Sequence, residues 1–176
     1  MQRHYPAIER FFSVKLPGAA ADLTQQTFLA CLEAADRLEK ASSFRAFLFG
    51  VARHVLLRHL RSEGRQAPVE SYTTRPGAPG ATPTGLIAQR EEQVLILRAL
   101  ESMPVDQRIV IELHYWEGLD SREIADVLRI PQSTVTTRLS RARGRLEKRL
   151  AELQPNAKAT PVAEMESWLR SLPAPP

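Results

Sequence analysis

Cysteine is almost absent from this chain, whose 176 residues include only Cys31. A single thiol excludes an internal disulfide and a zinc site built from several cysteines. The sequence also has no apolar run near the roughly 20 residues of a membrane span, and its first residues lack the apolar core of a signal peptide. We therefore expect a cytoplasmic protein without membrane insertion. Cys31 shares the apolar side of a helical pattern with Leu23, Phe28 and Leu32, and is expected to be buried.

Aromatic residues make up only 6% of the sequence, and its excess of positive charge is small. A net charge of +4 favours a polyanionic partner without proving one. The four histidines and the carboxylates form no metalloprotease, nucleophile-elbow or phosphate-loop motif. His54 and His59 are five residues apart, an unfavourable spacing for a shared metal ion on a helix. An enzyme is therefore the weakest interpretation, and no metal site or cofactor is predicted.

No segment of the sequence shows the alternation of apolar and polar residues that is typical of a strand. Apolar residues recur instead at helical spacing. The predicted helices lie at residues 5–16, 22–39, 43–62, 87–101, 105–117, 121–128 and 132–150. The sequence therefore predicts an all-α protein.

Proline and glycine divide the chain into two organised parts. Residues 64–85 hold eight of the 21 residues of these two types (13 proline, 8 glycine), a composition typical of a linker. We predict an N-terminal three-helix bundle at residues 1–63, a flexible linker at 64–86, and a C-terminal four-helix domain at 87–150. Residues 151–176 are predicted to be an extension that is either disordered or a short helix.

A helix-turn-helix pattern lies in the C-terminal part. Asp120 and Glu123 have the spacing of a capping box, which begins a helix. Pro131 ends that helix, because proline disfavours α geometry in the residue before it, and a second helix follows at once. The ten-residue separation of Ala125 and Val135 is typical of two helices that cross closely. The pattern indicates DNA binding.

The outer side of this second helix is polar and strongly basic. Between Arg138 and Arg149 there are six lysine or arginine residues and one acid, Glu147, which gives a local charge of +5. An isolated basic run is usually a solvated helix face. This run directly follows a helix-turn-helix pattern, so DNA contact is the better interpretation. The residues predicted to meet base edges or phosphates are Ser133, Thr134, Thr136, Thr137, Arg138, Arg141 and Arg143.

Motifs in both parts together resemble one family. The run Ala21–Phe28 and the segment Ser43–Phe49, which leads into Val51-Ala52-Arg53, look like the polymerase-binding and promoter-melting segments of bacterial sigma factors. The C-terminal part resembles the second DNA-binding domain of these factors at Met103-Pro104, Gln107-Arg108, Glu117-Gly118-Leu119, Glu123-Ile124-Ala125, Thr134-Val135, Arg138-Leu139 and Arg141-Ala142-Arg143. Two small helical domains with a short linker match the extracytoplasmic-function (ECF) group of the sigma-70 family.

The resemblance implies a factor that brings RNA polymerase to promoters and helps to melt them. Its contact with the clamp helices of the largest subunit of core polymerase would use Asp22, Gln25 and Gln26. The flap of the second-largest subunit and an anti-sigma factor would be further partners. The linker would either thread the polymerase or act as a passive tether, alternatives that the sequence leaves open.

For the minus-ten promoter element, the resemblance implies that the segment Arg37–Arg45 holds a flipped-out base while the third helix separates the strands. Extracting a base costs a few kcal/mol, which a pocket must offset. Phe44 and Phe47 lie at core spacing and are expected to pack inside, whereas Phe49 is offset from that face and more open to stacking on bases. The implied contacts are Arg45, Phe49, Arg53, Arg58, His59 and Arg61.

The helix that begins near Gln132 would enter the major groove of the minus-thirty-five element. Several residues depart from the family pattern, among them Arg129, Thr136 and Gly50. Arg129 stands where glycine is common at the turn, so it must adopt a left-handed conformation at a cost of roughly 1 kcal/mol or use another turn. Thr136 replaces a common lysine, and Gly50 replaces a long polar residue of the third helix.

One rival interpretation is a helix-turn-helix transcriptional regulator that acts without stoichiometric docking on polymerase. The resemblance of residues 21–62 to the polymerase-binding part of sigma factors argues against it. A pull-down of core polymerase distinguishes the two, because a simple regulator should not form a stoichiometric complex.

Overall fold

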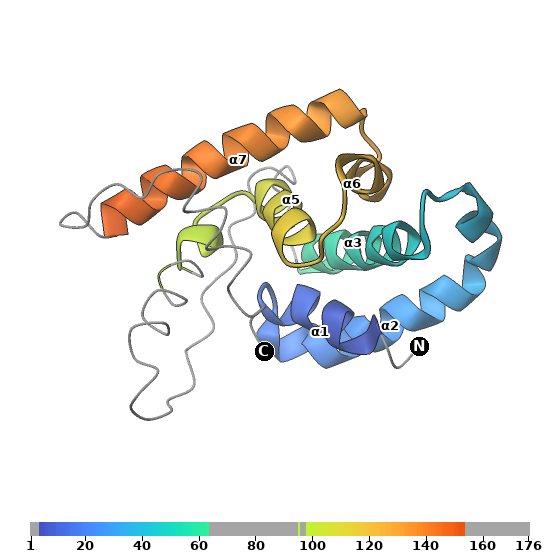
Figure 1. Cartoon of the computed structure of the whole chain (residues 1–176). Helices are drawn as coiled ribbons and strands as arrows, with labels where there is room; N and C mark the ends of the chain where they lie inside the picture. Colours follow the sequence, from blue (N-terminus) through green and yellow to red (C-terminus); the bar gives the residue numbers. More distant parts are fainter. Residues whose placement is uncertain (1–3, 64–94, 96–97, 154–176) are drawn as a thin grey trace, which may run out of the picture.

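The computed structural model describes residues 4–63, 95 and 98–153, and these form helices without any strand (Figure 1). The all-α prediction is confirmed. The predicted linker and most of the predicted helix at 87–101 and of the C-terminal extension lie outside the described residues. The elements are α1 (Tyr5–Ser13), η2 (Pro17–Ala19), α2 (Ala20–Glu33), η3 (Ala35–Lys40), α3 (Phe44–Ser62), α5 (Val105–Tyr115), α6 (Ser121–Leu128) and α7 (Gln132–Leu153), in which η marks a short 3-10 helix.

The helices begin at local sequence signals. Ser43 Oγ accepts a hydrogen bond from the Ala46 N–H at 3.1 Å and so caps α3. The predicted capping box of α6 is confirmed. The Asp120 carboxylate accepts from two backbone N–H groups of the first turn at 2.8 Å, and the Glu123 carboxylate accepts from the Asp120 N–H at 3.0 Å. Such a box satisfies donors that a helix start otherwise leaves without partners.

Two residues of the C-terminal part have a positive φ, one after α5 and one at the end of α6. Gly118 follows α5 and its C-cap residue Trp116, and has a φ of 62°. Arg129 ends α6 with a φ of 55° and a ψ of 49°, and it is alone among the described non-glycine residues in having a positive φ. The helix-turn-helix therefore keeps its turn, and arginine adopts a conformation that costs a residue with a β-carbon roughly 1 kcal/mol or more.

The N-terminal and C-terminal helices share one apolar core. α3 packs on α2 on one side and on α6 on the other (Figure 1). Phe12, Leu48 and Leu56 from the N-terminal part belong to the same buried cluster as Ile109 and Ile124 from the C-terminal part. A smaller cluster fills the space between α5 and α7. The two predicted helical units thus lie in direct contact.

Some apolar side chains of α2 and α3 differ from expectation. Phe47 is in the core as predicted, but Phe44 is 45% exposed because it lies in the first turn of α3, so its prediction as a core residue is wrong. Leu32, expected on the inner side of its helix, is 61% exposed. Phe49 is 2% exposed and meets Phe11 edge to face, with 5.8 Å between ring centroids. Its ring is enclosed by the core, in contrast to its prediction as a base-stacking residue.

Cys31 is buried, as predicted, and burial raises the pKa of its thiol from 9.0 to about 11. Among the described residues, no helix is both long enough and apolar enough to cross a membrane. The same part of the chain holds no group of three or more histidine, cysteine or acidic side chains placed for a metal ion.

Candidate nucleic-acid interface

α7 buries one side and presents the other to solvent. Val135, Ala142 and Leu146 are fully buried where α7 packs on α5 and α6. The opposite side carries hydroxyl and guanidinium groups, which can donate hydrogen bonds to phosphates and base edges. The residues predicted for the minus-thirty-five element are exposed or half-buried: Ser133, Thr134, Thr136, Thr137, Arg138, Arg141 and Arg143. Of these, Arg138 and Arg143 also contact α5, through Asp106 and through the ring of Tyr115 at 5.7 Å.

The residues predicted for core polymerase lie on the solvent side of α2. Asp22 and Gln25 are exposed, and Gln26 is half-buried. Gln26 Nε2 donates to the Asp22 carboxylate at 2.7 Å, and Gln26 Oε1 accepts from Arg58 of α3 at 3.2 Å. Gln26 therefore links Asp22 to Arg58 of α3.

Two leucines on the same side of α2 complete this surface. Leu29 is 62% exposed and Leu32 is 61% exposed. Leu29 stands four residues after Gln25 and seven after Asp22, a spacing that puts it on the same helix face. Sequence reasoning missed these two residues, because helical periodicity suggested a buried Leu32. We call the surface the α2 patch: Asp22, Gln25, Gln26, Leu29 and Leu32.

The residues predicted for the minus-ten element separate into two groups along α3. Arg58, His59 and Arg61 lie near its C-terminal end and are exposed or half-buried. Arg45 and Arg53 lie nearer its start, are half-buried, and are engaged by carboxylates of the C-terminal part.

Two of these carboxylates bind arginines predicted to contact DNA. Asp106 Oδ1 accepts from Arg53 at 3.2 Å, and its Oδ2 accepts from Arg138 at 3.5 Å. Glu117 forms an ion pair with Arg45 at 3.4 Å, and its backbone carbonyl also accepts from Arg45. Arginines from both predicted DNA surfaces are thus held within the chain.

A buried ionic cluster lies between α5 and the residues that follow α1. The Glu112 carboxylate accepts from the Lys15 ammonium and from Arg108 Nε, the latter at 2.8 Å. Lys15 also donates to the Phe11 carbonyl at 2.7 Å, and Arg108 donates to the Val14 carbonyl at 2.5 Å. Burial lowers the pKa of Lys15 from 10.5 to about 8, opposed by the attraction of Glu112. A buried charge is strongly destabilising without a close partner of opposite charge. This cluster therefore favours the one arrangement of α1 and α5 in which Lys15, Arg108 and Glu112 are all paired.

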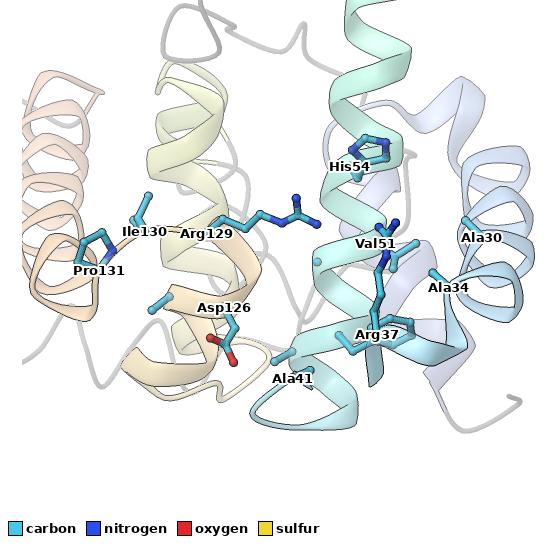
Figure 2. A pocket seen from close by; sticks show the side chains of 14 residues that line it. Ala30, Ala34, Arg37, Ala41, Val51, His54, Asp126, Arg129, Ile130 and Pro131 are labelled. Atoms are coloured by element: carbon cyan, nitrogen blue, oxygen red, sulfur yellow. The ribbon is translucent and has the colours of Figure 1, made fainter. Parts of the chain in front are cut away.

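A cavity of about 860 Å³ lies where α6 faces α3 (Figure 2). One wall includes Arg37 and His54, and the opposite wall includes Asp126 and Arg129. Figure 2 shows the Arg129 side chain extending from the end of α6 towards α3. The resemblance assigns the segment Arg37–Arg45 to a flipped-out base. This segment borders the cavity, and residues of the C-terminal part line the opposite wall.

Comparison with known proteins agrees with the resemblance. Residues 1–66 match the family described as Sigma-70 region 2, and residues 93–146 match Sigma-70, region 4. The ECF RNA polymerase sigma-E factor of Escherichia coli (strain K12) is 29% identical over 147 residues, covering 77% of this chain and 76% of that protein. The probable RNA polymerase sigma-C factor of Mycobacterium bovis is 36% identical over 148 residues, covering 79% of this chain and 72% of that protein. The chain belongs to the ECF group of sigma-70 factors.

This sigma factor is also similar to a solved structure. The sigma factor RpoE from Bartonella quintana, crystallised with the anti-sigma factor NepR, has a TM-score of 0.65 and 26% identity, covering 85% of this chain and 92% of that chain. A protein of this family directs transcription initiation by RNA polymerase at promoter DNA and is not an enzyme. The family assignment decides against the alternative of a regulator that acts without polymerase.

Proposed function

We propose that this sigma factor binds core RNA polymerase through the α2 patch and promoter DNA through α3 and α7. The polymerase contact of the α2 patch is the clamp helices of the largest subunit, and the C-terminal part contacts the flap of the second-largest subunit. The observation that carries the proposal is the pair Leu29 and Leu32, each more than 60% exposed beside polar groups. Exposed apolar side chains rimmed by polar residues are typical of protein-binding surfaces.

For the minus-thirty-five element, we propose that α7 enters the major groove with its polar side. The solvent exposure of this side and the local charge of +5 between Arg138 and Arg149 support the proposal. Thr136 and Thr137 donate to carbonyls four residues earlier in the helix, at 3.4 Å and 3.1 Å, so their methyl groups and oxygen lone pairs are the groups offered to DNA. Half or more of such contacts normally go to the DNA backbone.

For the minus-ten element, we propose that α3 and the segment Arg37–Arg45 hold the melted strand. The exposure of Arg58 and Arg61 and the cavity beside Arg37 support this assignment. Arg45 and Arg53 would contribute once DNA displaces their carboxylate partners. Phe49 is left out of the proposed contacts because it is buried.

The remaining predictions also stay proposals. The complex in which the Bartonella quintana sigma factor was solved supports an anti-sigma factor as a further partner. We further propose a cytoplasmic location, and the division of the chain at residues 63/64, 86/87 and 150/151. In this division the linker is residues 64–86 and the C-terminal extension is residues 151–176.

The proposed polymerase contact is tested by gel filtration and titration with purified core polymerase. Leu29→Ser should weaken the complex about tenfold or more, because burying one leucine contributes roughly 1.5–3 kcal/mol and each 1.4 kcal/mol is a factor of ten. Leu153→Ser is the matched control, since Leu153 is 41% exposed at the end of α7, away from the α2 patch. Equal binding by both variants would contradict the assignment.

The proposed minus-thirty-five contact is tested separately with Arg138→Ala. Promoter binding by the assembled polymerase should fall while binding to core polymerase is unchanged. Equal loss of both would mean that the substitution damaged the fold and not a DNA contact.

A further inference from the structure

The cavity between α3 and α6 has the size and lining of a small-molecule site (Figure 2). Its volume of about 860 Å³ lies within the range of roughly 300–1,000 Å³ that is usual for ligand pockets. The space exists because the surrounding elements face one another with small residues: Ala30, Ala34, Ala46, Gly50 and Ala125. Ligand pockets are mostly apolar and carry a few polar groups that orient the ligand. The polar side chains of this cavity therefore indicate which ligand it would hold.

Two guanidinium groups line the cavity on opposite walls. Arg37 and Arg129 are exposed, and neither side chain has a hydrogen bond or ion pair within the part of the chain that the structure describes. Figure 2 shows Arg129 extending from the end of α6 towards α3, and Arg37 running along α3 towards Val51. Guanidinium groups bind phosphates through paired, charge-assisted hydrogen bonds. Two such groups without partners favour a ligand that carries phosphate.

The backbone of Arg129 provides an independent observation. Its φ of 55° lies in the left-handed region, which is unfavourable for a residue with a β-carbon and which glycine adopts freely. No contact of the arginine side chain among the described residues compensates for this conformation. Residues held in unfavourable backbone conformations are concentrated at functional sites. A ligand bound by the guanidinium group would account for an arginine at this position.

The wall formed by α6 also carries a carboxylate. The Asp126 side chain accepts a hydrogen bond from the Ser42 N–H at 2.8 Å and has no other side-chain partner among the described residues. In Figure 2 the Asp126 and Arg129 side chains point in different directions. A carboxylate can accept hydrogen bonds from the N–H groups of a nucleobase. A nucleotide, with phosphate at one end and a base at the other, matches both kinds of group, whereas a fatty acid or an inorganic anion matches only one.

We propose that this cavity binds a free nucleotide. Arg37 and Arg129 bind its phosphates, and Asp126 accepts from the N–H groups of its base. The ring lies against the apolar wall that Phe47 and Val51 of α3 form. This site goes beyond the proposed function, because the cavity is present in the free chain and its ligand requires neither polymerase nor promoter DNA.

Isothermal titration calorimetry with the full chain, without polymerase or DNA, tests the site. The probes are ADP, GDP, CDP and UDP, with pyrophosphate and the four nucleosides measured separately. At least one nucleotide should bind at least tenfold more tightly than pyrophosphate and than its own nucleoside, because only the nucleotide engages both ends of the cavity. The proposal is overturned if no nucleotide binds at about 1 mM, or if pyrophosphate binds as tightly as every nucleotide.

Arg129→Gly tests the contact with phosphate. Glycine removes the guanidinium group and relieves the backbone, so the variant should remain folded. It should bind the best nucleotide about tenfold more weakly or worse, because hydrogen bonds to charged groups are lost. Arg122→Ala is the matched control, since Arg122 is another exposed arginine of α6 but does not line the cavity, and it should bind like wild type.

A second variant tests the space without changing the charge. Ala30→Phe places a large ring in the cavity and should prevent nucleotide binding, while circular dichroism reports that the helices are retained. Wild-type affinity in both Arg129→Gly and Ala30→Phe would overturn the proposal. Equal weakening by Arg129→Gly and Arg122→Ala would also overturn it, because the effect would then reflect the net charge of the protein and not this site.

Discussion

Replacing Arg129 with glycine should stabilise this protein, although the change removes a whole side chain. Arg129 has a φ of 55° and a ψ of 49° at the end of α6. In this region the β-carbon of an L-residue approaches the following carbonyl oxygen, at a cost of roughly 1–2 kcal/mol that glycine avoids. The Arg129 side chain is exposed, and no hydrogen bond or ion pair of it occurs among the described residues.

The size of the effect follows from two opposing contributions. Relief of the backbone strain gains roughly 1–2 kcal/mol, and the greater conformational freedom of glycine in the unfolded chain costs roughly 0.5–1 kcal/mol. The net gain in the free energy of unfolding should be about 0.5–1 kcal/mol. For a chain of this length that corresponds to an increase in Tm of about 1–4 °C.

Urea denaturation followed by circular dichroism measures this gain, with Arg129→Ala as the control. Alanine removes the same charge and length but keeps the β-carbon, so it should not stabilise the protein. If glycine and alanine have the same effect, or if glycine destabilises, then backbone strain at the turn is not the dominant contribution and the reasoning is wrong.

Three further predictions concern other parts of the molecule. Burial lowers the pKa of Lys15 to about 8, so between this value and 10.5 the folded state binds fewer protons than the unfolded chain, and the free energy of unfolding should rise with pH. The raised pKa of Cys31 has the opposite effect on the free energy of unfolding, but only above about pH 9. In urea titrations, Lys15→Met should therefore lack the rise between about pH 7.5 and 9. Asp120→Ala removes the cap of α6 and should lower the free energy of unfolding by about 1 kcal/mol, with Glu152→Gln unchanged, and an equal effect of both would contradict the role of the cap. The thiol of Cys31 should react with a thiol reagent at pH 8 at least tenfold more slowly in the native protein than in denaturant, and equal rates would contradict its burial.

A local sequence signal predicted the start of α6. The capping box joins Asp120 and Glu123, which are three positions apart, so its geometry follows from the chain itself. The unusual arginine at the turn, Arg129, could also be identified from the sequence alone. Of the two conformations expected there, the structure adopts the left-handed one.

Features that depend on distant residues could not be predicted. α3 is packed from two sides, by α2 and by α6, so its periodicity does not identify a single buried face. This explains why Phe49, which is offset from the predicted inner face, is buried. The pairing of Asp106 with Arg53 and Arg138 joins residues 53 and 32 positions apart. No local pattern marks such a contact, although it decides which arginines are available to DNA.

The most direct test of the central assignment is run-off transcription with purified core polymerase on genomic fragments, followed by mapping of the transcript starts. Wild-type protein should give promoter-specific transcripts from a small set of fragments. Leu29→Ser and Arg138→Ala should each reduce them, the former through polymerase binding and the latter through promoter binding. No promoter-specific transcripts from any fragment, with a protein that binds core polymerase stoichiometrically, would contradict the assignment.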